Sequence, residues 1–255
     1  MGGKQTQKIK PKKGGLKFLM CMFSLLVAEQ ISVITISSGY TILGDGVRKG
    51  FMEWIESDPG ASLLDVPPIE VGFLLLRGRG TARFTSAPSL SVHLYRYSSL
   101  LNEHPSGDTW LINLYVPAGI SFTYDLSDWE LFNFYPFFSR YFVGIGPAYS
   151  IFHARNYLVP ENFSTYGIVL KAIAMLGYEF DTWKGSAGIS VSWAYFSSYS
   201  RKEGATKKYL CAGSSTEEGI TFVEETVNEE GEKVLDGTPL KNHPLSVMVI
   251  VGASY

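Results

Sequence analysis

Four ionisable residues, Glu70, His93, Lys171 and Glu179, stand in segments where small or polar residues occupy every second position. Carboxylate, imidazole and ammonium groups can pair with one another, and burying them is costly unless they are paired or hydrated. Because alternate residues of a β-strand share a face, we expect these side chains to point toward one interior. The pattern predicts a buried polar network; a proton or ion gate is the alternative.

Histidines are the other candidates for chemistry, since hydrolysis or acyl transfer needs a histidine base beside a nucleophile such as serine. His104 is close to Ser106, but both lie in an expected loop. His153 has no adjacent serine, and His243 directly precedes Pro244. The sequence shows no metal-ligand spacing, phosphate loop or dinucleotide fingerprint. We therefore predict no catalytic, cofactor-binding or metal site, and expect that the protein is not an enzyme.

The elements that would position these residues are segments of about ten residues with strict hydrophobic alternation, as in membrane β-strands. The last segment is the clearest, and one of its faces consists of Val247, Val249, Val251, Ala253 and Tyr255. Eight such segments are expected, at residues 32–42, 69–79, 89–97, 110–124, 141–151, 166–180, 187–195 and 246–255. Their alternation predicts an all-β protein.

The connections between these segments fall into two sets. One side of the fold would carry the long connections, residues 43–68, 98–108, 156–165 and 200–244, and the other side residues 80–88, 126–140 and 181–185. Within the long connections, residues 47–57 have the spacing of a short amphipathic helix. Residues 219–237 indicate a β-hairpin that turns near Asn228. The sequence thus predicts an eight-stranded antiparallel up-and-down transmembrane β-barrel with long extracellular loops.

Composition supports this prediction. The chain has 15 Tyr, 16 Phe, 5 Trp and 26 Gly, and only 18% charged residues, below the roughly 25% of ordinary globular chains. The alternative is a soluble β-sandwich or lipocalin-like barrel, which would present Lys and Glu to water. Here the polar faces carry mainly Gly, Ser and Ala instead.

The N-terminal segment resembles targeting sequence rather than fold. Residues 1–17 contain six lysines and no acid, and the apolar run 18–28 is too short to cross about 30 Å of hydrocarbon as a helix. We predict a signal peptide at residues 1–28 and the barrel at residues 29–255; an uncleaved anchor reaching Ile42 is the alternative. Removing the six lysines leaves 16 of the 22 basic residues against 24 acids, a net charge of about −8. That charge disfavours nucleic-acid binding.

The terminal aromatic residue Tyr255, with hydrophobic residues at every second position before it, resembles the signal that the barrel-assembly machinery reads. Over essentially all of residues 29–255 the chain is similar to the small eight-stranded outer-membrane barrels of the OmpA and OmpX type. That resemblance implies a bacterial cell outer membrane with both termini periplasmic. It also implies outer-membrane lipid and lipopolysaccharide as neighbours, and the assembly machinery as a partner during biogenesis.

An eight-stranded barrel encloses an interior that side chains can fill. We therefore expect a structural or surface-interaction role through the extracellular loops. A narrow conduit for small hydrophobic solutes is the alternative, and a lipid-modifying outer-membrane enzyme, known on this fold, ranks last. Four arginines near expected strand ends could meet lipid phosphates: Arg77, Arg79, Arg96 and Arg140.

Overall fold

The computed structural model describes most of the chain after residue 30. The described ranges are residues 31–43, 46–57, 62–77, 80–98, 107–127, 136–155, 161–204, 206–212, 220–228 and 231–254. The predicted signal peptide and Tyr255 lie outside these ranges. Residues 31–43 form a β-strand, so a helical anchor reaching Ile42 is excluded.

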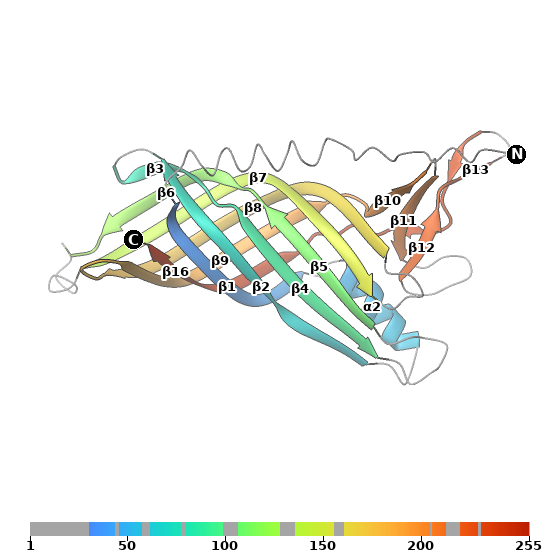
Figure 1. Ribbon diagram of the computed structural model, residues 1–255, viewed down its shortest axis with the longest axis horizontal. Coiled ribbons are helices and arrows are strands. Elements are labelled where there is room, and N and C mark those ends of the chain that lie inside the picture. Colours follow the sequence, from blue (N-terminus) through green and yellow to red (C-terminus); the bar gives the residue numbers. More distant parts are fainter. Residues whose placement is uncertain are drawn as a thin grey trace, which may run out of the picture.

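One antiparallel sheet closes on itself to form a barrel of eight strands (Figure 1). The predicted eight-stranded antiparallel β-barrel is therefore confirmed. β3 and β4 together make one strand of the barrel, and β5 and β6 make another; β1 pairs with β16, which completes the closure. The barrel segments are β1 (Ile31–Leu43), β2 (Ser62–Arg77), β3 (Ala82–Ser86), β4 (Ser89–Ser98), β5 (Gly107–Tyr115), β6 (Ala118–Asp125), β7 (Phe137–Arg155), β8 (Glu161–Glu179), β9 (Lys184–Phe196) and β16 (Leu245–Ser254).

Prolines mark the two places where a barrel strand is divided. Pro88 follows β3 and Pro117 follows β5, and neither residue has an N–H to give to the ladder. Their carbonyl groups still accept hydrogen bonds, from the amide of Phe73 at 2.9 Å and from the amide of Ala87 at 2.8 Å. The wall of the barrel therefore continues across both breaks.

Several strands extend beyond their predicted bounds. β2 begins at Ser62 rather than residue 69, because the ladder with β4 continues past Pro67 and Pro68 with a shift of register between Val66 and Ile69. Residues 82–86, which we assigned to a connection, form β3 and pair with β6. A register shift in β2 and the shortness of β3, which has five residues, hide these segments from a search for strict alternation.

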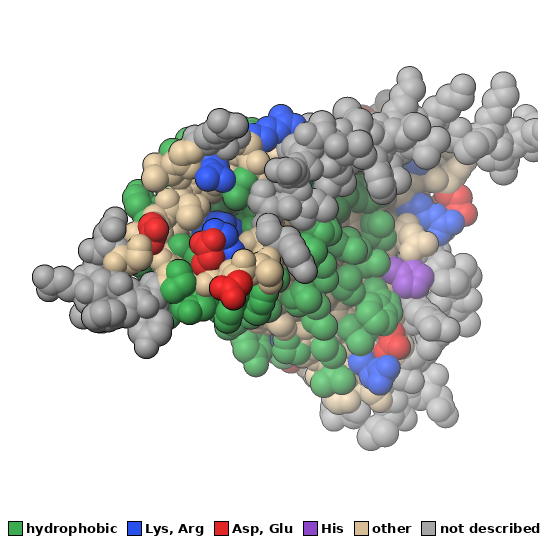
Figure 2. All heavy atoms as spheres, turned by 60° about the vertical axis from the view of Figure 1, so that its left-hand side comes forward, with side chains coloured by type: hydrophobic (Ala, Val, Ile, Leu, Met, Phe, Trp, Pro, Cys, Tyr) green, Lys and Arg blue, Asp and Glu red, His purple; other side chains and the backbone are tan. Residues whose placement is uncertain are grey.

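The outer wall of the barrel is apolar. Figure 2 shows hydrophobic side chains over the strands, with charged side chains toward the two ends. Ile145 of β7 is 55% exposed and lies between Tyr141 and Tyr149 on the same outward face. Tyr141 contacts Tyr124, with ring centroids 6.3 Å apart, and Tyr149 contacts Tyr166 at 4.8 Å. Aromatic pairs thus flank an aliphatic region of the wall on either side.

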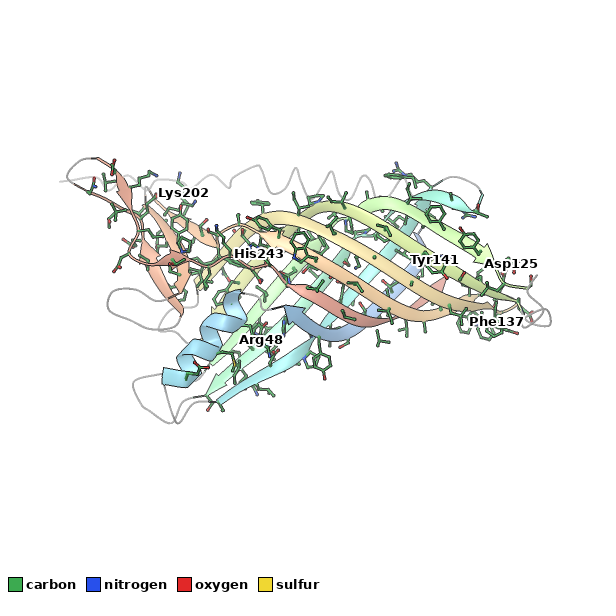
Figure 3. The ribbon with its side chains drawn as sticks, turned by 180° about the vertical axis from the view of Figure 1, so that it is seen from behind. Arg48, Asp125, Phe137, Tyr141, Lys202 and His243 are labelled. Atoms are coloured by element: carbon green, nitrogen blue, oxygen red, sulfur yellow. The ribbon has the colours of Figure 1, made fainter. Side chains whose placement is uncertain are left out.

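The barrel has two different ends. At the turn end, short connections join β2 to β3 and β8 to β9, and Asp125 and Phe137 lie there in Figure 3. The opposite end, here called the loop end, carries α2 (Gly46–Ser57), which confirms the helix predicted at residues 47–57. Within the described ranges, no helix is long and apolar enough to cross a membrane.

The loop end also carries an extension of short strands within residues 200–239, referred to below as the extension (Figure 1). β10 pairs with β8 and so prolongs the barrel wall. The predicted hairpin is shorter than expected: β13 pairs with β14 around a turn where Gly231 has a φ of 82°, but β12 pairs with β11 instead. The strands are β10 (Ser200–Glu203), β11 (Thr206–Ala212), β12 (Ile220–Glu224), β13 (Thr226–Val227), β14 (Lys233–Val234) and β15 (Thr238–Pro239).

Candidate functional site

The centre of the lumen contains an ion pair between opposite walls of the barrel. β2 and β8 are separated by three intervening barrel strands in either direction, so Glu70 and Lys171 meet across the lumen. The ammonium group of Lys171 donates hydrogen bonds to a carboxylate oxygen of Glu70 and, at 3.0 Å, to the hydroxyl of Ser89. Strand alternation points all three side chains inward.

This pair is almost fully withdrawn from solvent. Glu70 is 2% exposed and Lys171 is 4% exposed. The second carboxylate oxygen of Glu70 is buried and has no hydrogen-bond partner among the described residues. Each charge has lost its hydration, so the two groups depend on each other and on Ser89 for compensation.

His93 belongs to a second polar group, closer to the loop end. Its Nε2 lies 2.6 Å from a carboxylate oxygen of Asp65, and its Nδ1 lies 3.0 Å from the hydroxyl of Tyr95. Asp65 also forms an ion pair with Arg48 of α2, at 3.0 Å. The carboxylate of Asp65 therefore joins the helix at the loop end to the barrel wall.

A third polar group is built around Tyr199, just beyond β9. Its hydroxyl lies 2.7 Å from the hydroxyl of Ser150, which donates to the side-chain oxygen of Asn113 at 2.6 Å. The side-chain amide of Asn242 donates to the Tyr199 hydroxyl at 3.2 Å. Tyr199 and Asn242 were not predicted as site residues, since neither lies in a predicted strand and no sequence signal marks them.

Apolar side chains pack around these groups and fill the loop-end half of the lumen. One buried cluster joins the barrel to both added parts, through Val47 of α2 and Leu210 of β11. Its other buried members are Tyr95, Leu111, Phe152, Phe163, Tyr199 and Leu240. A second buried cluster joins Phe142 of β7 and Ile173 of β8 to side chains of β1, β2 and β16 inside the barrel. The lumen is thus occupied by protein side chains, as expected for eight strands.

The four residues of the predicted network are placed in three separate groups. Glu70 and Lys171 pair in the centre, and His93 lies with Asp65 and Tyr95. Glu179 is exposed at the turn end, where it pairs with Lys184 at 2.6 Å. Its inward parity is as expected, but β8 ends there, so its side chain reaches the rim and not the buried interior.

The other described histidines contact partners that suit structural roles. The Nδ1 of His153 lies 2.6 Å from the side-chain oxygen of Asn162, and the His243 ring stacks on Tyr195 with centroids 4.2 Å apart. His104 lies outside the described residues. Among the residues that the structure describes, no group of three or more His, Cys, Asp or Glu side chains is placed to hold a metal ion.

The proposed assembly-signal residues lie on the outward face of β16. Val249 and Val251 are exposed there, while Val247 is partly covered and stands opposite Tyr40 of β1. Ala253 continues this face, and Tyr255 lies outside the described ranges. β16 therefore presents an aliphatic face on the outside of the barrel, and the role of this face as an assembly signal stays a prediction.

Comparisons with family models, with curated proteins and with solved structures found no match for this chain. The similarity to barrels of the OmpA and OmpX type therefore stays a prediction from sequence.

Proposed function

We propose that this protein is an integral outer-membrane β-barrel of a diderm bacterium, with a structural or surface-interaction role at its loop end. One observation carries the proposal: the barrel is apolar outside and contains its polar groups inside. Ile36, Ile145 and Val249 are exposed on the outer wall, whereas Ser91, Asn113 and Lys171 are buried. Contiguous apolar surface of this kind suits contact with lipid.

Closure supports the same proposal. Hydrocarbon offers no hydrogen bonds to backbone groups, so only helices and closed barrels can span a membrane. Here the ladder between β1 and β16 satisfies the edges that an open sheet would expose. The apolar wall and the closed ladder together favour insertion into a bilayer, with outer-membrane lipid and lipopolysaccharide as neighbours.

The filled lumen favours a structural role over a conduit. Glu70 and Lys171 connect opposite walls, and the cluster that contains Tyr95, Phe152 and Phe163 occupies the loop-end half. A solute would have to displace these packed side chains to pass. The extension, which continues beyond β8 and β9, offers polar side chains for contact with a partner at the cell surface.

The orientation can be tested with a short epitope tag at either end. A tag inserted in the turn after Asn228 should be detected by antibody on intact cells of a diderm host. A matched tag inserted between Asp181 and Trp183, at the turn end, should be detected only after the outer membrane is permeabilised. The opposite accessibility, or recovery of the protein in the soluble fraction, would overturn the proposal.

A conductance measurement separates the structural role from the conduit. Purified protein in planar bilayers is expected to give no steady single-channel current. A stable current that increases when α2 is removed would instead support a conduit with α2 as its lid. The role in surface contact is tested by adhesion of whole cells. Cells that carry the intact protein are compared with cells in which a short glycine-rich turn replaces the Thr226–Val234 hairpin. Equal adhesion of the two would count against a surface-contact role for this hairpin.

A further inference from the structure

At the turn end the barrel opens into a hollow of about 400 Å³, here called the arginine hollow. Arg83, Arg140 and Lys184 line it, together with the carboxylates of Asp125 and Glu179. The hollow includes the Glu179–Lys184 pair described above and is separate from the polar groups around Glu70, His93 and Tyr199. Arg140 points into the barrel and is 7% exposed, so its guanidinium belongs to this hollow and not to the outer wall.

The carboxylates and the lysine of the hollow already have partners. Glu179 pairs with Lys184 at 2.6 Å. Asp125 accepts hydrogen bonds from the amide of Ser127 at 2.9 Å and from its hydroxyl at 2.7 Å. No ion pair joins these acids to Arg83 or Arg140 among the described residues.

The two guanidinium groups are therefore left with donors to spare. The Nε of Arg140 is buried without a hydrogen-bond partner in the described structure. Its guanidinium carbon lies 5.4 Å from the centroid of Phe138, which forms a cation–π contact but accepts no conventional hydrogen bond. Arg83 uses its Nε to donate to the carbonyl of Gly80 at 2.8 Å, which leaves its terminal nitrogens for another acceptor.

The strand order directs both arginines to the same place. Arg83 stands opposite Ser121 on β6, and Arg140 stands opposite Thr123 on the other edge of β6. The backbones of β3 and β7 are thus two strand spacings apart, about 10 Å. Two long inward side chains at that separation can contact one small ligand from two sides.

We propose that the arginine hollow is a binding site for a phosphate-class oxyanion. The planar fork of arginine matches the oxygens of phosphate and carboxylate in a bidentate manner. The three cations Arg83, Arg140 and Lys184 outnumber the two carboxylates Asp125 and Glu179, so the hollow has a net charge of +1 and favours an anion. A phosphate monoester carries about −1.5 to −2 charge near neutral pH and offers three acceptor oxygens to the two guanidinium groups. The N–H groups of Arg83 and Arg140 donate hydrogen bonds to the phosphate oxygens, whereas Lys184 stays paired with Glu179. The phosphate can belong to a free ion or to a lipid headgroup at the rim.

The experiment uses the full chain, folded in neutral detergent and titrated with inorganic phosphate at constant ionic strength by calorimetry. Saturable binding at one site is expected. Arg140→Gln and Arg83→Gln should each weaken phosphate affinity at least tenfold, because each removes one guanidinium. Arg96→Gln is the matched control: it removes an exposed arginine at the loop end, outside the lining of the hollow, and it should change affinity less than threefold.

Two further titrations settle the class and the source of the anion. Acetate that binds as tightly as phosphate would overturn the assignment to phosphate. A short-chain phosphatidic acid that binds more tightly than inorganic phosphate would support the site and assign it to lipid headgroups; weaker binding would support the site and assign it to free phosphate.

The failure modes are distinguishable. Absence of saturable binding, or equal binding by Arg140→Gln and the native chain, would overturn the proposal. A further control is the double variant Asp128→Asn with Glu130→Gln, which removes two acids that lie between β6 and β7 in sequence. Phosphate binding by this variant but not by the native chain would also overturn the proposal, since acids of the chain itself would then be the partners of the two arginines. Heat-modifiable migration on a gel checks that each variant folds; if Arg140→Gln does not fold, Arg83→Gln carries the test. The inference does not depend on the proposed surface role.

Discussion

Glu70 and Lys171 show how a single buried pair constrains the lumen. The variant Lys171→Met should lower the free energy of unfolding by about 3–5 kcal/mol, because it leaves the Glu70 carboxylate buried without its counter-ion. The double variant Glu70→Leu with Lys171→Met should recover most of that loss. Urea titrations of the folded barrel in vesicles measure both. An equal loss in the single and double variants would mean that packing, and not charge, dominates here.

Cys211 offers a pH test outside the barrel wall. It is the free cysteine of the described residues and is buried, and burial together with the Asp236 carboxylate raises the pKa of its thiol from 9.0 to about 11. In a Cys21→Ser chain, the thiol should therefore resist alkylation at pH 8 until urea unfolds the extension. Rapid labelling of the folded protein at that pH would contradict the placement.

The raised pKa of the Cys211 thiol also predicts how the free energy of unfolding changes with pH. The folded chain holds the thiol proton more tightly than the unfolded chain. The contribution of the Cys211 thiol to the free energy of unfolding is therefore fully present below pH 9 and is lost as pH rises toward 11. The free energy of unfolding should thus fall over that interval. A Cys211→Ala variant should lack this part of the pH dependence, which separates it from titration of lysines and tyrosines.

At the level of residues, the sequence predicted which side chains point into the barrel better than it predicted which of them pair with each other. Alternation correctly pointed Glu70, His93 and Lys171 inward, since parity is a local property of a strand. It did not predict that Lys171 meets Glu70 while His93 meets Asp65, because partners depend on which strands face each other and at what register. Arg140 was expected near a strand end, but its side was not assigned from parity.

Among the elements, α2 depends on the barrel for its position. The carboxylate of Asp65 forms an ion pair with Arg48 and lies within hydrogen-bond distance of His93. Val47 of the helix is packed in the buried cluster that also contains Tyr95 and Leu210. Asp65→Asn should loosen the helix while the barrel stays folded, and cleavage by trypsin near Arg48 should become severalfold faster.

The control for this variant is Asp108→Asn. It breaks the exposed pair between Arg96 and Asp108, whose atoms lie 2.7 Å apart at the same end of the barrel. Solvent screens an exposed pair, so its loss changes stability little and cleavage should stay close to that of the native chain. Similar acceleration by both variants would show that Asp65 has no special role in holding α2.

The elements were predicted well where their pattern is regular. β8 and β9 alternate without interruption, and both were identified, although β8 begins at Glu161 rather than residue 166 and β9 begins at Lys184 rather than residue 187. The first residues of β2 were missed because two prolines and a register shift interrupt the strand, and β3 was missed because it is only five residues long and ends just before Pro88. The extension was predicted as a loop with one hairpin, since its strands are only two to seven residues long, too short to show a clear alternation.

For the whole molecule, one substitution can show whether lipid covers the outer wall. Ile145→Arg places a charge between the aromatic pairs and should cost about 2–4 kcal/mol in vesicles if that site lies near the middle of a bilayer. Val227→Arg, at an equally exposed position of β13, should cost little. Chemical unfolding in vesicles gives both values. Equal, small effects would favour a soluble barrel and contradict the proposed membrane insertion.

The ion pair across the lumen also has a consequence for the order of folding. Glu70 and Lys171 are 101 residues apart in sequence, and their strands are as distant around the barrel as two strands can be. The contact can therefore form only when both halves of the sheet have curved toward each other. A slip of one residue in β8 would turn Lys171 to the outer wall and leave Glu70 unmatched. The pair thus stabilises the barrel that closes in the correct register, and a barrel that closes out of register is less stable because it lacks this contact. Its loss should accelerate unfolding more than it slows folding.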